Sequence, residues 1–220
     1  MVERLCRLMV MAVVVIAALS GVANGQQSVN SKPTKLVAFG DSLTAGLGLP
    51  AVASFPAKLE TALRAKGHKV DVVNAGVSGD TVADGLARLD WSIPQDADAV
   101  IIELGANDAL RGLDPKATRA GLDEIVKRLR QRNVAVMLAG MYAPRNLGPD
   151  YSAQFDPIYP DLAKAYDLPL YPFFLDGVAT DPKLNQADGL HPTAAGVDVI
   201  VARILPTVEA LLTKVSAQRS

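Results

Sequence analysis

The chain has few of the side chains on which metal sites, disulfides and thiol chemistry depend. Its 220 residues include one cysteine, Cys6, and two histidines, His68 and His191. Cys6 precedes an apolar run near the N-terminus, and removal of that segment would leave no cysteine for a disulfide, a thiol nucleophile or a cysteine-bound metal. Two histidines leave only all-carboxylate metal sites, and the spacing of an EF-hand loop is absent. We therefore predict that the protein uses no metal and no cofactor.

The chain also lacks an excess of positive charge and two common active-site motifs. Lys and Arg number 22 against 23 Asp and Glu, and no basic cluster occurs, which argues against a nucleic-acid partner. Neither the phosphate-binding pattern Gly-x-x-x-x-Gly-Lys-Ser/Thr nor the nucleophile elbow Gly-x-Ser-x-Gly is present. These absences exclude a phosphate-binding loop of that kind and the usual α/β-hydrolase elbow.

The N-terminal segment has the layout of a secretory signal peptide. Arg4 and Arg7 precede 12 apolar residues, 8–19, and small residues follow up to Gly25. We expect a signal peptide over residues 1–25, a flexible lead-in over 26–34 and a single domain over 35–220. The apolar run is shorter than the ~20 residues of a membrane-spanning helix, so an uncleaved anchor is only the alternative. The mature protein is thus predicted to be periplasmic or secreted, monomeric and without a stable membrane anchor.

Apolar strand-like segments alternate with segments of helical periodicity along the remaining chain. The expected strands cover residues 36–39, 70–73, 97–104, 134–139 and 168–174, and the expected helices cover 54–65, 81–89, 115–130, 151–165 and 193–215. Prolines suggest an edge position for the last strand, breaks near Pro157 and Pro160, and a bend at Pro206. This alternation predicts an α/β fold, with a five-stranded parallel sheet covered by helices on both faces.

A small polar stretch, Gly40-Asp41-Ser42-Leu43, follows the first expected strand. Reactive groups collect at the carboxyl ends of strands in such sheets, so Ser42 is a candidate nucleophile. The backbone N–H groups of the turn that follows would be free to face an anion. The alternative is that Ser42 only caps a helix.

A nucleophilic serine needs a base that is oriented by a third group, and the chain offers two histidines. His68 lies in a charged turn at the amino end of the second strand, which favours a solvated surface role. His191 follows the fifth strand, and Asp188, three residues earlier, can reach its Nδ1–H across a tight turn. The alternative is that Asp188 caps the turn and His191 is idle.

Donors for an oxyanion are expected from the loops after the second and third strands. Gly79 has no Cβ to keep a substrate away from its N–H, and Asn107 carries a side-chain NH₂. Together with the N–H of Ser42 they would form a three-donor hole, although both are ordinary turn residues. Ser78 is a rival nucleophile, but its position beside Gly79 favours a role in the turn.

Four stretches together resemble the blocks of the SGNH (GDSL) hydrolases, in particular the bacterial periplasmic thioesterase/lysophospholipase/arylesterase branch. They are Gly40-Asp41-Ser42-Leu43, Ser78-Gly79-Asp80-Thr81, Gly105-Ala106-Asn107-Asp108 and Asp188-Gly189-Leu190-His191-Pro192. The resemblance implies a three-layer, flavodoxin-like α/β/α sandwich and activity on acyl esters and thioesters. It also implies Ser42, Asp188 and His191 as catalytic residues, and Ser42, Gly79 and Asn107 as the oxyanion hole. The loop at residues 140–146 does not match that branch residue by residue.

Apolar side chains in the loops after the third and fourth strands are candidates for an acyl-binding groove, although such residues also anchor loops. They are Leu110, Met141, Tyr142, Pro144 and Leu147. The expected partner is therefore a small acyl ester or thioester. The alternatives are a carbohydrate O-deacetylase, which would need a polar groove, and a binding protein without turnover.

Overall fold

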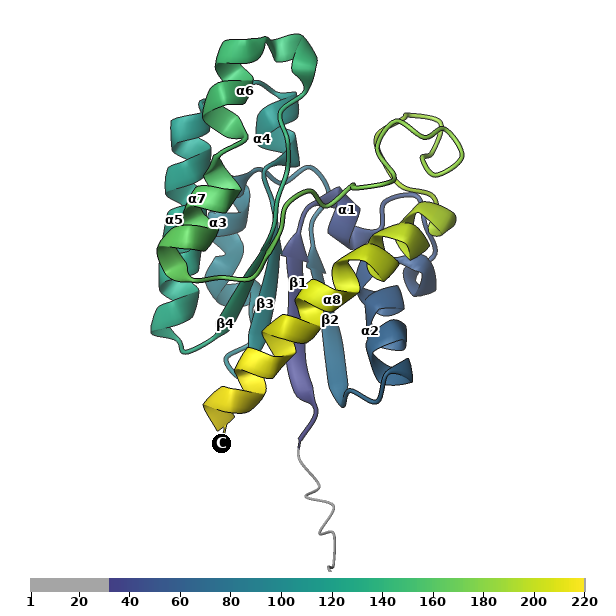
Figure 1. Cartoon of the computed structure of the whole chain (residues 1–220), viewed down its shortest axis with the longest axis vertical. Helices are drawn as coiled ribbons and strands as arrows, with labels where there is room; N and C mark the ends of the chain where they lie inside the picture. Colours follow the sequence, from purple (N-terminus) through teal and green to yellow (C-terminus); the bar gives the residue numbers. More distant parts are fainter. Residues whose placement is uncertain (1–31, 220) are drawn as a thin grey trace, which may run out of the picture. The chain divides into compact units, whose positions relative to one another are not determined.

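Five parallel strands form the centre of the fold, in the spatial order β2–β1–β3–β4–β5. Figure 1 shows the first four of these side by side. This computed structural model describes residues 32–219, so the expected signal peptide and Cys6 lie outside the described residues. The strands are β1 Thr34–Gly40, β2 Val70–Gly76, β3 Ala99–Glu103, β4 Ala135–Ala139 and β5 Leu170–Tyr171. All residues of β3 and β4 are buried, as expected for parallel strands that are covered on both faces.

Helices cover both faces of the sheet, which gives a three-layer α/β/α sandwich. Helices α2 (Phe55–Ala65) and α8 (Ala194–Arg219) pack together on one face. Helices α3 (Val82–Ser92), α5 (Pro115–Gln131) and α7 (Ile158–Tyr166) cover the other face (Figure 1). The shorter elements are α1 Ser42–Ala45, η1 Ala51–Ala53, α4 Ala106–Leu110, η2 Arg145–Leu147 and α6 Pro149–Phe155. None of the helices in residues 32–219 combines the length and the apolar character that a membrane crossing requires.

The expected strands and helices are present, and two of the differences from the prediction follow from proline chemistry. The expected helix over residues 151–165 is two helices, α6 and α7, that are separated at Asp156 and Pro157. The predicted break at Pro160 is wrong, because Pro160 lies in the first turn of α7, where no intrahelical N–H is lost. The edge position of the last strand is confirmed, but β5 has two residues rather than seven, since the prolines on either side of it cannot donate to the ladder.

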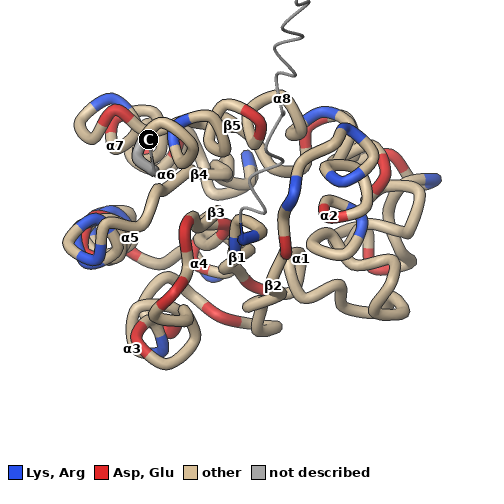
Figure 2. Tube along the Cα trace, turned by 90° about the horizontal axis from the view of Figure 1, so that it is seen from below, with Lys and Arg blue, Asp and Glu red and all other residues tan. Residues whose placement is uncertain are grey.

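Charged residues of both signs are interspersed on the outer helices. Figure 2 shows acidic and basic positions next to one another on α3, α5 and α7. Arg128 of α5 pairs with Asp90 of α3, and Arg119 of α5 lies 2.9 Å from Asp161 of α7. These exposed pairs contribute little individually, and the apolar faces beneath them hold the layer together.

Candidate active site

Ser42 is the first residue of α1, directly after the carboxyl end of β1. Asp41 caps this helix, and its Oδ1 accepts a hydrogen bond from Leu43 N–H at 2.9 Å. The interpretation of Ser42 as a helix cap is therefore wrong. The turn requires glycine at position 40, because a Cβ there would lie 2.2 Å from Thr44 Oγ1 and 2.5 Å from the carbonyl oxygen of Glu103. The strand thus ends so closely packed that Ser42 is fixed at the edge of the sheet.

The loop before α8 brings a histidine and an aspartate to Ser42. His191 Nε2 lies 2.9 Å from Ser42 Oγ, and His191 Nδ1 lies 2.6 Å from Asp188 Oδ2. The other carboxylate oxygen of Asp188 accepts the N–H groups of His191 and Leu190, which hold the pKa of this carboxyl well below its usual range. An ionised Asp188 keeps the proton of the neutral ring on Nδ1, so that Nε2 can accept the Ser42 hydroxyl proton.

The other serine and histidine considered from the sequence lie apart from this arrangement. His68 precedes the amino end of β2, and its Nε2 lies 3.1 Å from Oε1 of Glu209 on α8. His68 is half-buried rather than fully solvated. Ser78 is exposed, and the hydroxyl that contacts the ring of His191 is that of Ser42.

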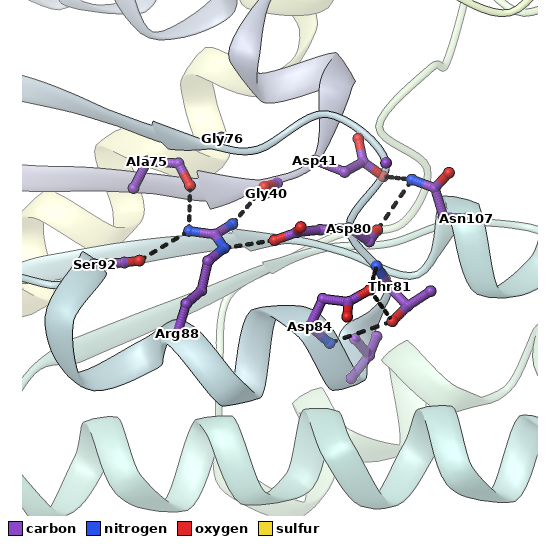
Figure 3. A network of polar contacts seen from close by, with 12 residues as sticks. Gly40, Asp41, Ala75, Gly76, Asp80, Thr81, Asp84, Arg88, Ser92 and Asn107 are labelled. Carbon is purple, nitrogen blue, oxygen red and sulfur yellow. Dashed lines mark hydrogen bonds and ion pairs between the residues drawn. The ribbon is translucent and has the colours of Figure 1, made fainter.

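The three expected oxyanion donors lie on adjacent segments, and they differ in what they contact. Gly79 has φ +89°, a conformation that favours glycine. The N–H groups of Ser42 and Gly79 have no hydrogen-bond acceptor within the described part of the chain. The side-chain NH₂ of Asn107 donates to Asp41 Oδ2 at 3.1 Å and to the carbonyl oxygen of Asp80 at 3.0 Å (Figure 3). Two donors are thus free to receive a ligand, whereas both N–H groups of the Asn107 amide are engaged, and one of them must leave its acceptor before it can bind an oxyanion.

Two buried carboxyl groups lie beneath the nucleophile, and the sequence interpretation missed both. Burial raises the pKa of Asp41 to about 6, although the Leu43 N–H and the Asn107 amide oppose this shift. Burial also raises the pKa of Glu103 well above its usual value. Glu103 Oε2 accepts the Thr44 hydroxyl at 2.6 Å, whereas Oε1 has no partner among residues 32–219. The available signal was a carboxylate, Glu103, at the end of the apolar run 99–104.

A cleft of about 480 Å³ opens beside Ser42, and apolar side chains dominate its walls. Four of the five expected groove residues line it together with Ser42, Asn107 and His191, namely Leu110, Met141, Tyr142 and Pro144; Leu147 is not among its walls. Tyr142 stacks on Phe173 with ring centroids 4.9 Å apart, which makes one wall aromatic. No cluster of three or more His, Asp or Glu side chains that is suited to a metal ion occurs in the described residues.

Comparison with known proteins agrees with this arrangement. Residues 38–199 match the GDSL-like Lipase/Acylhydrolase family. The arylesterase of Vibrio mimicus is 43% identical over 159 residues, which cover 72% of this chain and 80% of that protein. Thioesterase 1/protease 1/lysophospholipase L1 of Escherichia coli K12 is 42% identical over 158 residues, 71% of this chain and 74% of that protein.

A solved structure supports the same conclusion. The crystal structure of AlinE4, an SGNH-hydrolase family esterase, has a TM-score of 0.69 and 48% sequence identity, and the match covers 83% of this chain and 98% of that one. The fold, the length of the match and the level of identity are consistent with one another. The chain therefore belongs to the GDSL-like lipase/acylhydrolase family, the SGNH hydrolases, and is an enzyme of the carboxylic ester hydrolase class.

Proposed function

We propose that the enzyme hydrolyses acyl esters and thioesters through an acyl-enzyme formed on Ser42. The observation that carries the proposal is the continuous contact from Asp188 Oδ2 to His191 Nδ1, at 2.6 Å, and from His191 Nε2 to Ser42 Oγ, at 2.9 Å. Such a relay activates a hydroxyl that is otherwise a weak nucleophile. The neighbouring N–H donors would stabilise the charge that develops on the substrate carbonyl oxygen.

In the proposed reaction, Ser42 Oγ attacks the acyl carbonyl carbon while His191 Nε2 takes the hydroxyl proton. The N–H groups of Ser42 and Gly79 bind the oxyanion of the tetrahedral intermediate, and the Asn107 amide joins them by exchanging its contact with Asp41 Oδ2 for the oxyanion. His191 then gives the proton to the departing oxygen or sulfur, and the acyl group remains on Ser42. A water molecule, deprotonated by His191, attacks the acyl-enzyme, and a second tetrahedral intermediate collapses to the free acid and Ser42. Asp188 stabilises the imidazolium form in each half-reaction.

The cleft favours an apolar acyl group as the part of the substrate that it holds. Its walls include Leu110, Met141 and the stacked pair Tyr142 and Phe173, which offer apolar surface but few groups for sugar hydroxyls. This lining favours an acyl ester over the O-deacetylase alternative. The relatives named above as arylesterase and as thioesterase/lysophospholipase support the same class of substrate. With the predicted signal peptide, we propose action on esters or lysophospholipids in the periplasm or outside the cell.

Replacement of Ser42 by alanine tests the proposal. We expect Ser42→Ala to abolish hydrolysis of p-nitrophenyl butyrate and labelling by a fluorophosphonate, while the circular dichroism spectrum stays that of the wild type. Ser78→Ala is the matched control, because it removes an exposed hydroxyl from the neighbouring loop, and it should retain both properties. An undiminished rate in Ser42→Ala would disprove the mechanism. A wild-type protein that forms no adduct at Ser42 would favour a binding protein without turnover.

A further inference from the structure

A buried guanidinium lies beneath the loops that carry the proposed oxyanion donors. Arg88 projects from α3 toward the carboxyl ends of β1 and β2 and is 5% exposed (Figure 3). Its Nε donates to Asp80 Oδ2 at 2.5 Å, and Nη2 donates to the carbonyl oxygen of Gly40 at 2.8 Å. Nη1 donates to the carbonyl oxygen of Ala75 at 2.9 Å and to Ser92 Oγ at 3.1 Å. Four of the five guanidinium N–H groups are thus in use.

Two of these contacts end within two residues of a residue of the proposed site, and a third ends on the strand that leads to it. Gly40 is separated from Ser42 by one residue, and Ala75 lies near the end of β2, which leads into the loop with Gly79. Asp80 follows Gly79 directly, and its carbonyl oxygen accepts the side-chain N–H of Asn107 at 3.0 Å. A single side chain therefore connects, within one or two residues, the segments that carry all three donors.

The loop with Gly79 is fixed on its other side by the start of α3. The side chain of Thr81 accepts the N–H of Asp84, and the carboxylate of Asp84 accepts the Thr81 hydroxyl at 2.7 Å and the Thr81 N–H at 3.0 Å. Between this capping box and β2, the carboxylate of Asp80 is the side chain that reaches inward, and it contacts Arg88. Arg111 Nη2 also donates to the carbonyl oxygen of Gly79, at 2.8 Å. The position of the Gly79 N–H therefore depends on the ion pair of Asp80 and Arg88 together with this contact.

We propose that Arg88 is a positioning residue for the oxyanion hole, an inference that rests on the proposed function. Oxyanion donors act because they are held in place before charge develops, and a displacement of about 1 Å can cost about 100-fold in rate. Lysine could keep the positive charge, but its ammonium group cannot match the planar fork that reaches Gly40, Ala75 and Asp80 together. The contribution of Arg88 is therefore geometric, and it affects the transition state more than substrate binding.

The test compares Arg88→Lys and Asp80→Asn with a control in a second arginine. Arg132 donates to the carbonyl oxygens of Ile93 and Pro94, at 3.0 and 2.8 Å, on the path between α3 and β3 at the opposite edge of the sheet. Arg132→Met should therefore destabilise the fold without moving the oxyanion donors. For each variant we would measure Tm, the fraction of active sites by fluorophosphonate titration, and kcat and KM for p-nitrophenyl butyrate per titrated site.

We expect Arg88→Lys to lower kcat about 10- to 100-fold, with KM within about threefold of the wild type. Asp80→Asn, which keeps the shape but weakens the ion pair, should lower kcat about threefold to tenfold. Arg132→Met should lower Tm and leave kcat unchanged. The loss of kcat caused by Arg88→Lys should be at least about fivefold smaller in the Asn107→Ala background than in the wild type, because both residues act on the same oxyanion hole. A difference of about fivefold is roughly the coupling expected between residues of one network.

The opposite results would overturn the inference. A kcat for Arg88→Lys within about threefold of the wild type would show that the fork is not needed for catalysis. Equal losses of kcat in Arg88→Lys and Arg132→Met would assign Arg88 to stability alone. The same conclusion would follow if the double variant with Asn107→Ala lost kcat by the product of the two single losses. If Arg88→Lys does not fold, Asp80→Asn carries the test, and a kcat for this variant equal to that of the wild type would overturn the inference. Failure of the proposed function is distinguishable, because Ser42→Ala would then retain activity.

Discussion

The buried carboxyl group of Asp41 should make the enzyme less stable as the pH rises from about 4 to about 8. Burial raises the pKa of Asp41 from an ordinary 3.8 to about 6 in the folded state. The folded protein therefore holds this proton more tightly than the unfolded chain. The resulting stabilisation is fully present below the unfolded pKa and is lost as the pH rises through about 6. Because each pKa unit is worth about 1.4 kcal/mol, the loss amounts to about 3 kcal/mol.

Asp41→Asn isolates this contribution. Asparagine keeps an acceptor for the Leu43 N–H, but its NH₂ would face the NH₂ of Asn107, so the variant carries a fixed cost. That cost does not depend on pH, and it cancels when each protein is compared with itself. Urea unfolding between about pH 4 and pH 8 should show the free energy of unfolding falling by about 2.5 kcal/mol more in the wild type than in Asp41→Asn. Repulsion between the buried Glu103 and Asp41 acts in the same direction and can only enlarge the difference.

A surface carboxyl group whose pKa is lowered rather than raised provides the control. Lys35 and Lys32 lower the pKa of the exposed Asp96 to about 2. Asp96→Asn should therefore give a pH dependence parallel to that of the wild type above about pH 4. Wild-type and Asp41→Asn curves that stay parallel to within about 1 kcal/mol would refute the reasoning, since Asp41 would then titrate alike in the folded and unfolded states.

Two further predictions concern the reaction itself. Asn107→Ala should lower kcat about 10²- to 10³-fold for p-nitrophenyl butyrate if its NH₂ binds the oxyanion, and a loss below about tenfold would reduce it to a turn residue. Tyr142→Ala removes the partner of Phe173 from the aromatic wall of the cleft. The ratio of kcat/KM for p-nitrophenyl octanoate to kcat/KM for p-nitrophenyl acetate should fall about tenfold. A tenfold change corresponds to the loss of roughly 50 Å² of buried apolar surface. An unchanged ratio would place the acyl chain elsewhere.

Local patterns were sufficient to predict the sheet and the proposed catalytic group. The strand before Ser42 is an uninterrupted buried apolar run, and its glycine end marks the turn. Asp188 and His191 are three residues apart, so their contact depends on one tight turn that the sequence shows directly. The approach of His191 to Ser42 spans 149 residues, but it follows from a topological rule, namely that loops after parallel strands meet at one edge.

The residues that support the site could not be predicted in the same way. Arg88 lies in an amphipathic helix, where a charged residue ordinarily faces solvent, and its contact with Gly40 becomes visible only when α3 is placed against β1. Asp80 similarly precedes a capping box and resembles any polar residue at a helix start. Glu103 interrupts an apolar strand, but its partner Thr44 is 59 residues away. Such contacts depend on the docking of elements rather than on the pattern within one element.

Solvation separates the roles of the carboxyl groups around the proposed nucleophile. Asp188 is reached by backbone N–H groups and by solvent, so it remains an anion and can stabilise the imidazolium of His191 throughout the working pH range. Asp41 is buried, and its carboxylate holds Asn107 but would also repel an oxyanion bound by the same amide. The guanidinium of Arg88 lies on the same side of the sheet edge and donates to the carbonyl oxygen of the residue before Asp41. Because this cation is already paired with Asp80, the planar fork rather than the charge favours arginine at position 88.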